Sequence, residues 1–234
     1  MQTETTTEEN SAPSTRGKRR QTLTQSKVVE KFHIGLDNVE HPEIKPRMET
    51  AVGYDDEALA ADRDLLGQTV QARGVQQQQH AEARATHKVE ERAEKALRSA
   101  FVFLHKLIRY ADRLNKELDI KSILQTKSLP MAETALLDYC TSLLDRMEAN
   151  ADVMAAMVQV RVDADRITEL RNLLSVMRQA NVDQAQEQGE AEQATAIFDA
   201  LLGQLRIAYA MFIASAQEAL SDEPQLLELL GISA

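Results

Sequence analysis

Residues 96–118 read ALRSAFVFLHKLIRYADRLNKEL, and this stretch decides the fold. Apolar residues recur in it every seven residues, a period typical of helices that pack along a shared seam. The repeating positions are Leu97, Leu104, Ala111 and Leu118, with Ala100, Leu107 and Leu114 between them. Phe101 and Ile108 widen the stripe, as expected for a helix that contacts more than one neighbour.

The composition extends this helical interpretation to most of the chain. Of 234 residues, 43% are hydrophobic and 27% charged, which is enough apolar material to bury a core. Only 4% are aromatic, and eight Gly and five Pro are few for an α/β enzyme of this length. Ala, Gln, Glu, Leu and Arg are good helix formers. We therefore expect an all-α fold, an elongated helical bundle or antiparallel coiled coil of long helices.

Helix boundaries follow from the positions of prolines, acidic residues and capping residues in the sequence. No proline lies between residues 54 and 129, and none between residues 131 and 223. Acidic residues at 55–57 suit a helix N-terminus, and Asn150 is a good N-cap. These signals predict helices over about residues 55–118, 130–149, 152–220 and 224–230, within a helical domain of residues 54–234.

Two polar, glutamine-rich stretches interrupt the apolar pattern, at residues 74–95 and 178–195. If Gly189 marks a turn, the chain folds into a compact four-helix bundle. If the later helix is unbroken, the two polar stretches lie side by side in an antiparallel pair. The second arrangement is favoured, because a turn more often carries Pro or paired Gly and Asn.

The first 53 residues are expected to form an extended or disordered N-terminal arm. Within it, residues 28–36 carry apolar side chains at period two, which predicts a short strand-like docking segment. Basic residues precede this segment and are opposite in sign to the acidic helical body, so the arm is expected to contact a neighbouring copy. The predicted interface residues are Arg19, Arg20, Val28, Phe32, Ile34 and Leu36.

The histidines and the single cysteine do not form a recognisable metal site or catalytic site in the sequence. None of the five histidines has a Glu three residues before it, the spacing used by di-iron bundles. His87 and Glu91 share a helix face, but two ligands are too few for a stable site, and the heptad places both His80 and His87 beside the seam. Cys140 lies in an apolar stretch and is expected to be a buried thiol, and His105 a partly buried imidazole.

Motifs for cofactors and catalysis are not found in the sequence. There is no Gly-rich phosphate loop, GxSxG, HExxH or CxxC, so we expect no cofactor, no small-molecule substrate and no enzymatic activity. A net charge of −10 argues against nucleic acid as a partner.

The N-terminus has no apolar signal region, and no run of about eighteen apolar residues occurs. These features predict a cytoplasmic location, with non-classical export left open. The function expected from the sequence is that of a non-enzymatic structural or interaction protein that self-associates as a homo-oligomer, filament or shell component. Membrane-active helical proteins and helical-bundle metal-binding proteins are the alternatives.

Overall fold

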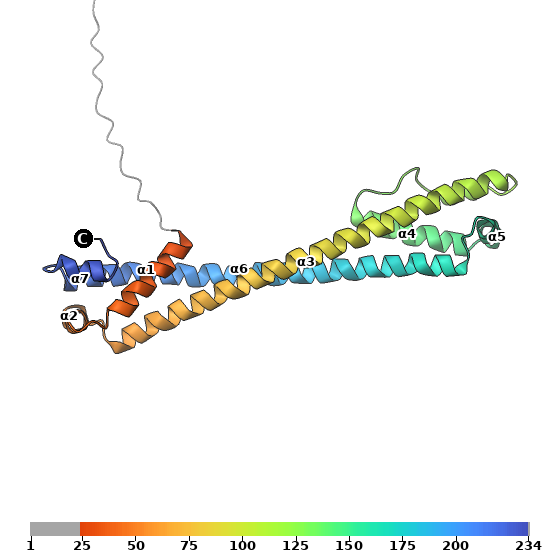
Figure 1. The fold of residues 1–234 in the computed structure, drawn as a ribbon. Coiled ribbons are helices and arrows are strands. Elements are labelled where there is room, and N and C mark those ends of the chain that lie inside the picture. The colour runs from red at the N-terminus through yellow and green to blue at the C-terminus, as the bar shows by residue number, and fades with distance from the viewer. Residues whose placement is uncertain (1–23, 234) are drawn as a thin grey trace, which may run out of the picture. The chain divides into compact units, whose positions relative to one another are not determined.

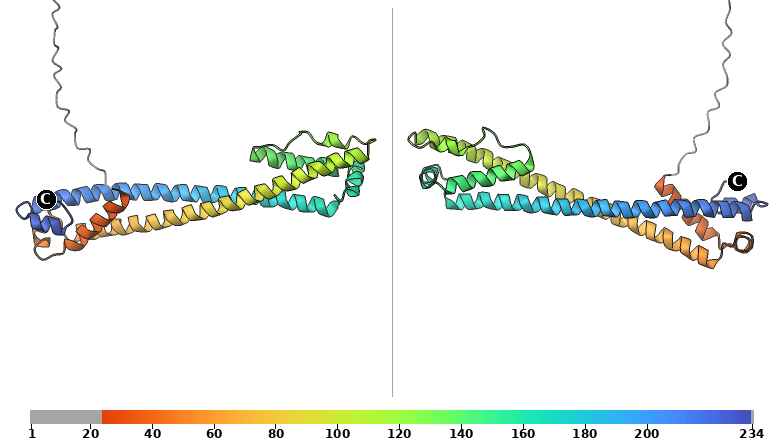
Figure 2. Two further views of the ribbon diagram at one scale, coloured as in Figure 1. Left: turned by 45° about the horizontal axis from the view of Figure 1, so that its top comes forward. Right: turned by 180° about the vertical axis from the view of Figure 1, so that it is seen from behind.

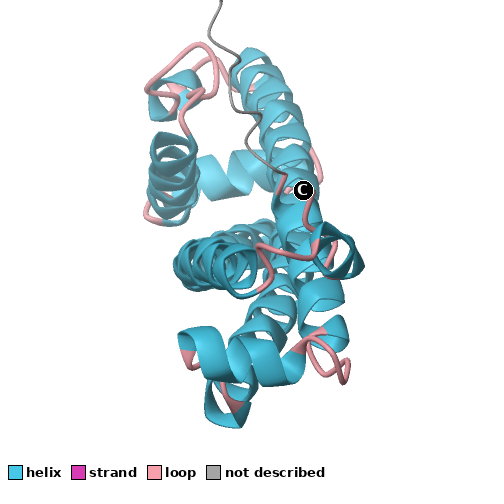
Figure 3. Ribbon diagram, turned by 90° about the vertical axis from the view of Figure 1, so that its left-hand side faces the viewer, coloured by secondary structure: helices cyan, strands magenta, loops and turns pink. Residues whose placement is uncertain are grey.

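The computed structural model describes residues 24–233, and every regular element among them is a helix (Figure 3). In chain order these are α1 (Gln25–Asn38), α2 (Lys45–Val52), α3 (Asp56–Leu114), the short 3-10 helix η1 (Ile120–Ile123), α4 (Glu133–Glu148), α5 (Ala151–Gln159), α6 (Ala164–Ala219) and α7 (Pro224–Leu229) (Figure 1). The all-α expectation is confirmed, and two of the helices are very long, with 59 and 56 residues.

Two compact units divide the chain. Unit 1 contains the described residues 24–66 and 205–233, and unit 2 is Gly67–Gln204. Helices α1, α2 and α7 belong to unit 1, and η1, α4 and α5 belong to unit 2, while α3 and α6 contribute residues to both.

Unit 1 is built around aromatic side chains. The ring of Phe32 on α1 lies 5.5 Å from that of Tyr209 and 5.7 Å from that of Phe212, both on α6. Tyr54 packs edge-on against Phe212 at 5.6 Å. The views of Figure 2 show α1 lying beside the C-terminal part of α6. A Cβ placed on Gly35 would lie only 2.6 Å from Phe212 Cε1, so this glycine lets α1 approach the aromatic cluster.

The strand expected at residues 28–36 is therefore wrong, because this segment is part of α1. Val28, Phe32 and Leu36 follow one another at four-residue spacing, which places them on one face of a helix. All three are buried in unit 1, whereas Ile34 points away and is 40% exposed. The apolar positions at period two belong to a core-facing helix, and the predicted docking strip is a packed face. Arg19 and Arg20 lie outside the described residues.

Unit 2 contains an apolar cluster formed by α3, η1, α4, α5 and α6. Leu97, Phe101, Leu104, Ile108 and Ala111 of α3 are all buried in it. Of the predicted heptad positions, Leu97, Leu104 and Ala111 therefore face a core, whereas Ala100 and Leu107 are only half-buried and Leu114 is 53% exposed. Helix α3 ends at Leu114, so Leu118 lies after it, partly buried against the same cluster. Helix α4 begins at Glu133, three residues later than expected.

The predicted helix over residues 152–220 is divided in two. Asn150 Oδ1 accepts the backbone N–H groups of Asp152 and Val153, both at 3.1 Å, and caps α5 as expected. The chain then turns, and Arg161 adopts a left-handed conformation with φ of 65°. Asp163 Oδ1 accepts the Arg166 N–H at 2.9 Å and caps α6. From that cap α6 is unbroken through Gly189, so the alternative with a turn at this glycine is wrong.

The two polar stretches meet inside unit 2. Gln76 Nε2 donates to Thr195 Oγ1 at 3.3 Å, and His80 Nε2 lies 3.1 Å from the same oxygen. Residue 76 is near the start of one polar stretch and residue 195 is at the end of the other, as antiparallel pairing requires. Ala72, Gln76, Gln79, Ala83, Thr86 and Glu90 form the half-buried seam here, while His80 and His87 are exposed beside it.

Replacing Gly35 with alanine tests the packing of unit 1. The added methyl group meets the Phe212 ring, so we expect Gly35→Ala to destabilise the protein by about 1–3 kcal/mol, the usual range for overpacking. Gly74→Ala is the matched control, because a Cβ at Gly74 meets nothing within 4 Å and alanine favours a helix by about 0.5–1 kcal/mol. Thermal unfolding followed by circular dichroism should show opposite shifts, and equal midpoints for the two variants contradict the packing.

Candidate functional site

The clearest unexplained surface in unit 2 is an apolar stripe on the outer side of α3. Phe103, Tyr110 and Leu114 are 52%, 52% and 53% exposed, although they are large apolar side chains. Together with two half-buried residues and one exposed alanine they form a run with alternating spacings of four and three. We call this run the outer stripe: Ala96, Ala100, Phe103, Leu107, Tyr110 and Leu114.

The outer stripe is distinct from the buried face of the same helix. The positions that enter the core of unit 2 are Leu97, Phe101, Leu104, Ile108 and Ala111. The outer stripe follows the same seven-residue period, displaced by one residue toward the N-terminus at most turns. Helix α3 therefore carries two adjacent apolar faces, and the neighbours within unit 2 bury only one of them fully.

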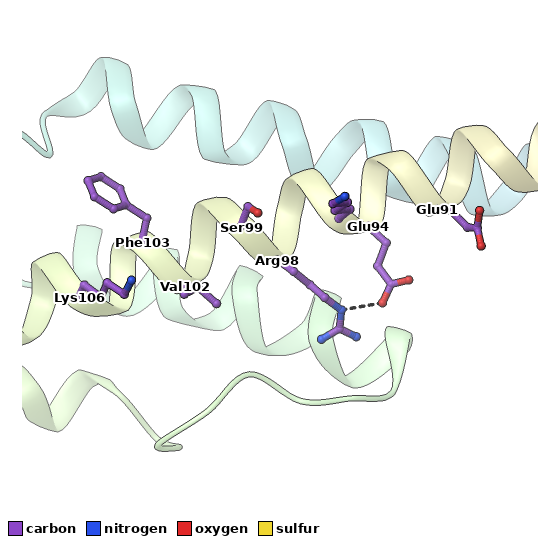
Figure 4. A pocket seen from close by; sticks show the side chains of 8 residues that line it. Glu91, Glu94, Arg98, Ser99, Val102, Phe103 and Lys106 are labelled. Atoms are coloured by element: carbon purple, nitrogen blue, oxygen red, sulfur yellow. Dashed lines mark hydrogen bonds and ion pairs between the residues drawn. The ribbon is translucent and has the colours of Figure 1, made fainter.

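A hollow of about 700 Å³ lies next to the outer stripe, and all of the residues that line it come from α3 (Figure 4). Phe103 and Lys106 are at one end, and Glu91 and Glu94 are at the other. Arg98 is held in place here: Nε donates to Glu94 Oε1 at 2.6 Å, and the two terminal nitrogens donate to the carbonyl oxygens of Pro130 and Met131, both at 2.7 Å. A surface formed by one helix suits contact with another macromolecule better than enclosure of a small molecule.

The outer stripe has a basic rim on its side away from the core. At about 100° per residue, Lys95, Lys106 and Arg113 border the stripe there, while Arg98, Arg109 and Lys116 lie farther around the helix. Residues 95–116 contain six basic residues and one acid, namely Lys95, Arg98, Lys106, Arg109, Arg113, Lys116 and Asp112. Within residues 24–233, Arg98 is the one member of this basic group that forms an ion pair. Arg109 and Arg113 also line a second hollow of about 560 Å³ with Asp112, Lys121 and Lys127. This concentration of positive charge stands out in a chain whose net charge is −10.

The weak metal candidates His87 and Glu91 do lie near each other. His87 Nδ1 is 2.9 Å from Glu90 Oε2, and His87 Nε2 is 3.8 Å from Glu91 Oε1, so each ring nitrogen faces a different carboxylate. In the described part of the chain, no three His, Cys, Asp or Glu side chains come together as a ligand group.

One carboxylate near Glu90 was not singled out from the sequence. Burial raises the pKa of Glu133, and the nearby negative charge of Glu90 raises it further. Residues 90 and 133 come from α3 and α4, and the heptad of α3 alone contains no signal that identifies their contact.

His105 and Tyr139 form a buried polar pair between α3 and α4. Tyr139 Oη lies 2.8 Å from His105 Nε2, and the two rings meet edge to face. Burial raises the pKa of the Tyr139 hydroxyl, so this group stays protonated at neutral pH while it shares a hydrogen bond with the imidazole. Burial, and secondarily the positive charge of Arg109, lowers the pKa of His105. The expected partly buried imidazole is confirmed.

Cys140 is fully buried in the core of unit 2, as expected. Burial raises the pKa of its thiol to about 12, so the thiolate that would act as a nucleophile is scarce at neutral pH.

Helix α6 has a more apolar window than its sequence suggested. Eighteen consecutive residues within it reach a mean hydropathy of 1.5 with no more than two charges, and 28% of that window is buried. By length and composition alone this helix is able to cross a membrane, although we expected no such helix from the sequence.

The lowered pKa of His105 predicts an acid-dependent loss of stability. As the pH falls below about 6.5, the unfolded chain binds a proton at this histidine while the folded chain does not. Stability is therefore fully present above that pH and decreases as the pH falls toward the lower pKa of the folded state. Urea unfolding at pH 7.5 and 5.5 should show a smaller decrease for His105→Gln than for the wild type. His41→Gln, at an exposed position, is the control and should behave as the wild type does.

The Cys140 thiol should not react with thiol reagents in the folded protein. A pKa of about 12 in place of 9 leaves roughly a thousandfold less thiolate at pH 8, and burial blocks the reagent as well. Ellman's reagent should find no reactive thiol in the native protein and one per chain in guanidinium chloride. Rapid labelling of the native protein contradicts the buried placement.

Comparison of the chain with protein-family models, with curated proteins and with solved structures found no match.

Proposed function

We propose that the chain is a non-enzymatic structural or interaction protein that self-associates through helical faces. The single observation that carries the proposal is the outer stripe of α3, because Phe103, Tyr110 and Leu114 are each about half exposed at heptad spacing. Scattered exposed apolar residues are normal on a protein surface, but a contiguous apolar run bordered by charges typically marks a contact site. Alternating spacings of four and three fit another helix.

The burial of His105, Tyr139 and Cys140 in unit 2 supports a non-catalytic role. His105 and Tyr139 bond to each other inside the core, and Cys140 is buried among leucines and methionines. A catalytic base or nucleophile must reach a substrate. In unit 2 these groups are closed off from the hollows on the outer side of α3, whose linings include none of the three.

The N-terminal segment contributes less to this proposal than its sequence indicated. Val28, Phe32 and Leu36 are buried within unit 1, so they do not supply a free docking strip. The coiled-coil character of the protein is accordingly proposed for contacts between copies, where the outer stripe of α3 packs against a helix of another chain.

A membrane-active protein is the second candidate, and the apolar window of α6 is the observation that favours it. Asp199 and Arg206 lie within the most apolar part of this helix. A charge near the centre of a bilayer is costly, so surface association is the form that this candidate would take. Leakage of a dye from anionic liposomes distinguishes the two candidates.

Light scattering coupled to size-exclusion chromatography tests self-association. From about 1 to 100 μM, the mass should rise above the 26.1 kDa of one chain. The triple variant Phe103→Gln, Tyr110→Gln, Leu114→Gln removes the apolar outer stripe at exposed positions and should remain monomeric with unchanged helical content.

The matched control replaces three exposed apolar residues outside the outer stripe: Met131→Gln, Val158→Gln and Leu229→Gln. This variant should assemble as the wild type does. A wild-type chain that stays monomeric throughout the concentration range rules the proposal out, and dye release by that monomer then supports the membrane-active candidate.

A further inference from the structure

We infer that the outer stripe of α3 binds a specific surface on a second copy of the same chain, the outward face of α6 within unit 2. The inference rests on the proposed self-association and adds the identity of both surfaces. It predicts a joint between two different surfaces, rather than a symmetric contact of one surface with itself.

The second surface follows from the seven-residue period of α6. Seven positions between residues 182 and 203 have alternating spacings of four and three, and all of them are exposed. None is charged, although 27% of the whole chain is charged. We call them the outer face of α6: Val182, Gln186, Gly189, Gln193, Ala196, Ala200 and Gly203. The buried face of α6, which includes Ala191, Ala194 and Phe198, points the opposite way.

Two glycines on this face lie next to open space in the described structure of their own chain. A Cβ on Gly189 or Gly203 would meet nothing within 4 Å, and neither residue has a positive φ. Glycine within a helix costs about 1 kcal/mol relative to alanine. A neighbouring helix that lies close to α6 would use the space that these residues leave, and large side chains such as Phe103 and Tyr110 are suited to fill it.

Charge identifies which surface of the second copy fits. Residues 182–203 contain five acidic residues and no basic residue: Asp183, Glu187, Glu190, Glu192 and Asp199. Among the residues that the structure describes, none of these five forms an ion pair. Glu187 is half-buried on the inner side, and the other four are exposed. At about 100° per residue, Glu190 and Glu192 lie at opposite edges of the outer face of α6.

The two surfaces are therefore complementary in three respects. The outer stripe of α3 presents large apolar side chains with a basic rim, and the outer face of α6 presents small uncharged residues with an acidic rim. Both follow the same heptad spacing over about the same length. Pairing the outer stripe with itself would instead place Lys106 and Arg113 against their own copies, and like charges in contact are unfavourable.

One chain can use both surfaces at once, because they occupy different stretches of α3 and α6 in unit 2. A contact between two different surfaces leaves one of each free after every addition. Such assemblies grow into open filaments, or into rings when the rotation between copies closes.

Charge reversal on each side tests this pairing. The first variant, Lys106→Glu with Arg113→Glu, gives the outer stripe an acidic rim. The second, Glu190→Lys with Glu192→Lys, gives the outer face of α6 a basic rim. In the wild type, Glu190 and Glu192 accept side-chain hydrogen bonds from Gln186 and Gln188 and form no ion pair among the described residues, so the helix should be retained. Each variant alone should raise the dissociation constant for self-association by at least about tenfold.

Recombining the variants provides the decisive comparison. An equimolar mixture should recover association, because the acidic α6 of the first variant meets the basic stripe of the second. A chain that carries all four changes should assemble by itself. Association of the wild type should also weaken as NaCl rises from 0.05 to about 0.5 M, since exposed charges are screened.

Several results overturn the pairing and leave self-association in place. Wild-type behaviour of the α6 variant shows that another surface covers the outer stripe of α3. If the α3 variant associates as the wild type does, Lys106 and Arg113 do not contribute to the interface. Two variants that are each impaired and fail to recover when mixed are not direct partners. A wild-type chain that never associates rejects the proposed function as well, so the two failures are distinguishable.

Discussion

The burial of one face of α3 in unit 2 is the constraint on which the other features of this unit depend. Five side chains of α3 fill the core: Leu97, Phe101, Leu104, Ile108 and Ala111. Their burial fixes the rotation of α3 about its own axis. Because a helix is rigid, every remaining side chain then has a fixed direction. Phe103 and Tyr110 are exposed for this reason, and His105 is turned inward to meet Tyr139 of α4.

The heptad made much of this arrangement predictable from sequence. It identified Leu97, Leu104 and Ala111 as buried positions of α3 and placed His80 and His87 beside the seam. The pairing of the two glutamine-rich stretches was predictable from the lack of a turn signal in the second one. Local chemistry was equally informative at the caps. The acidic start of α3 and the Asn150 cap of α5 both follow from hydrogen bonds to the first free N–H groups of a helix.

The errors have identifiable physical causes. Residues 28–36 contain apolar positions at both two- and four-residue spacing, and only the partner, the aromatic cluster with Phe212, decides between a strand and a helix. The break before α6 lacks both Pro and Gly, because Arg161 adopts the left-handed conformation that usually favours glycine. The heptad also predicts Ala100, Leu107 and Leu114 as seam positions, whereas the structure leaves them half-buried or exposed. The exposure of an apolar position depends on how many neighbours cover α3, which is a tertiary property.

The thin seam between residues 72 and 90 of α3 has a consequence for motion. Its contacts are made by alanine, glutamine and threonine, and Gln79 Oε1 is shielded from water without a hydrogen-bond partner. Few apolar contacts hold this region, while the neighbouring cluster around Leu104 is densely packed. Backbone amides here should exchange with deuterated water through small local openings, long before the cluster itself unfolds. Helix α3 is continuous, but its amides should therefore exchange at two different rates. Exchange should be fast in the segment at residues 72–90 and slow in the neighbouring segment around Leu104.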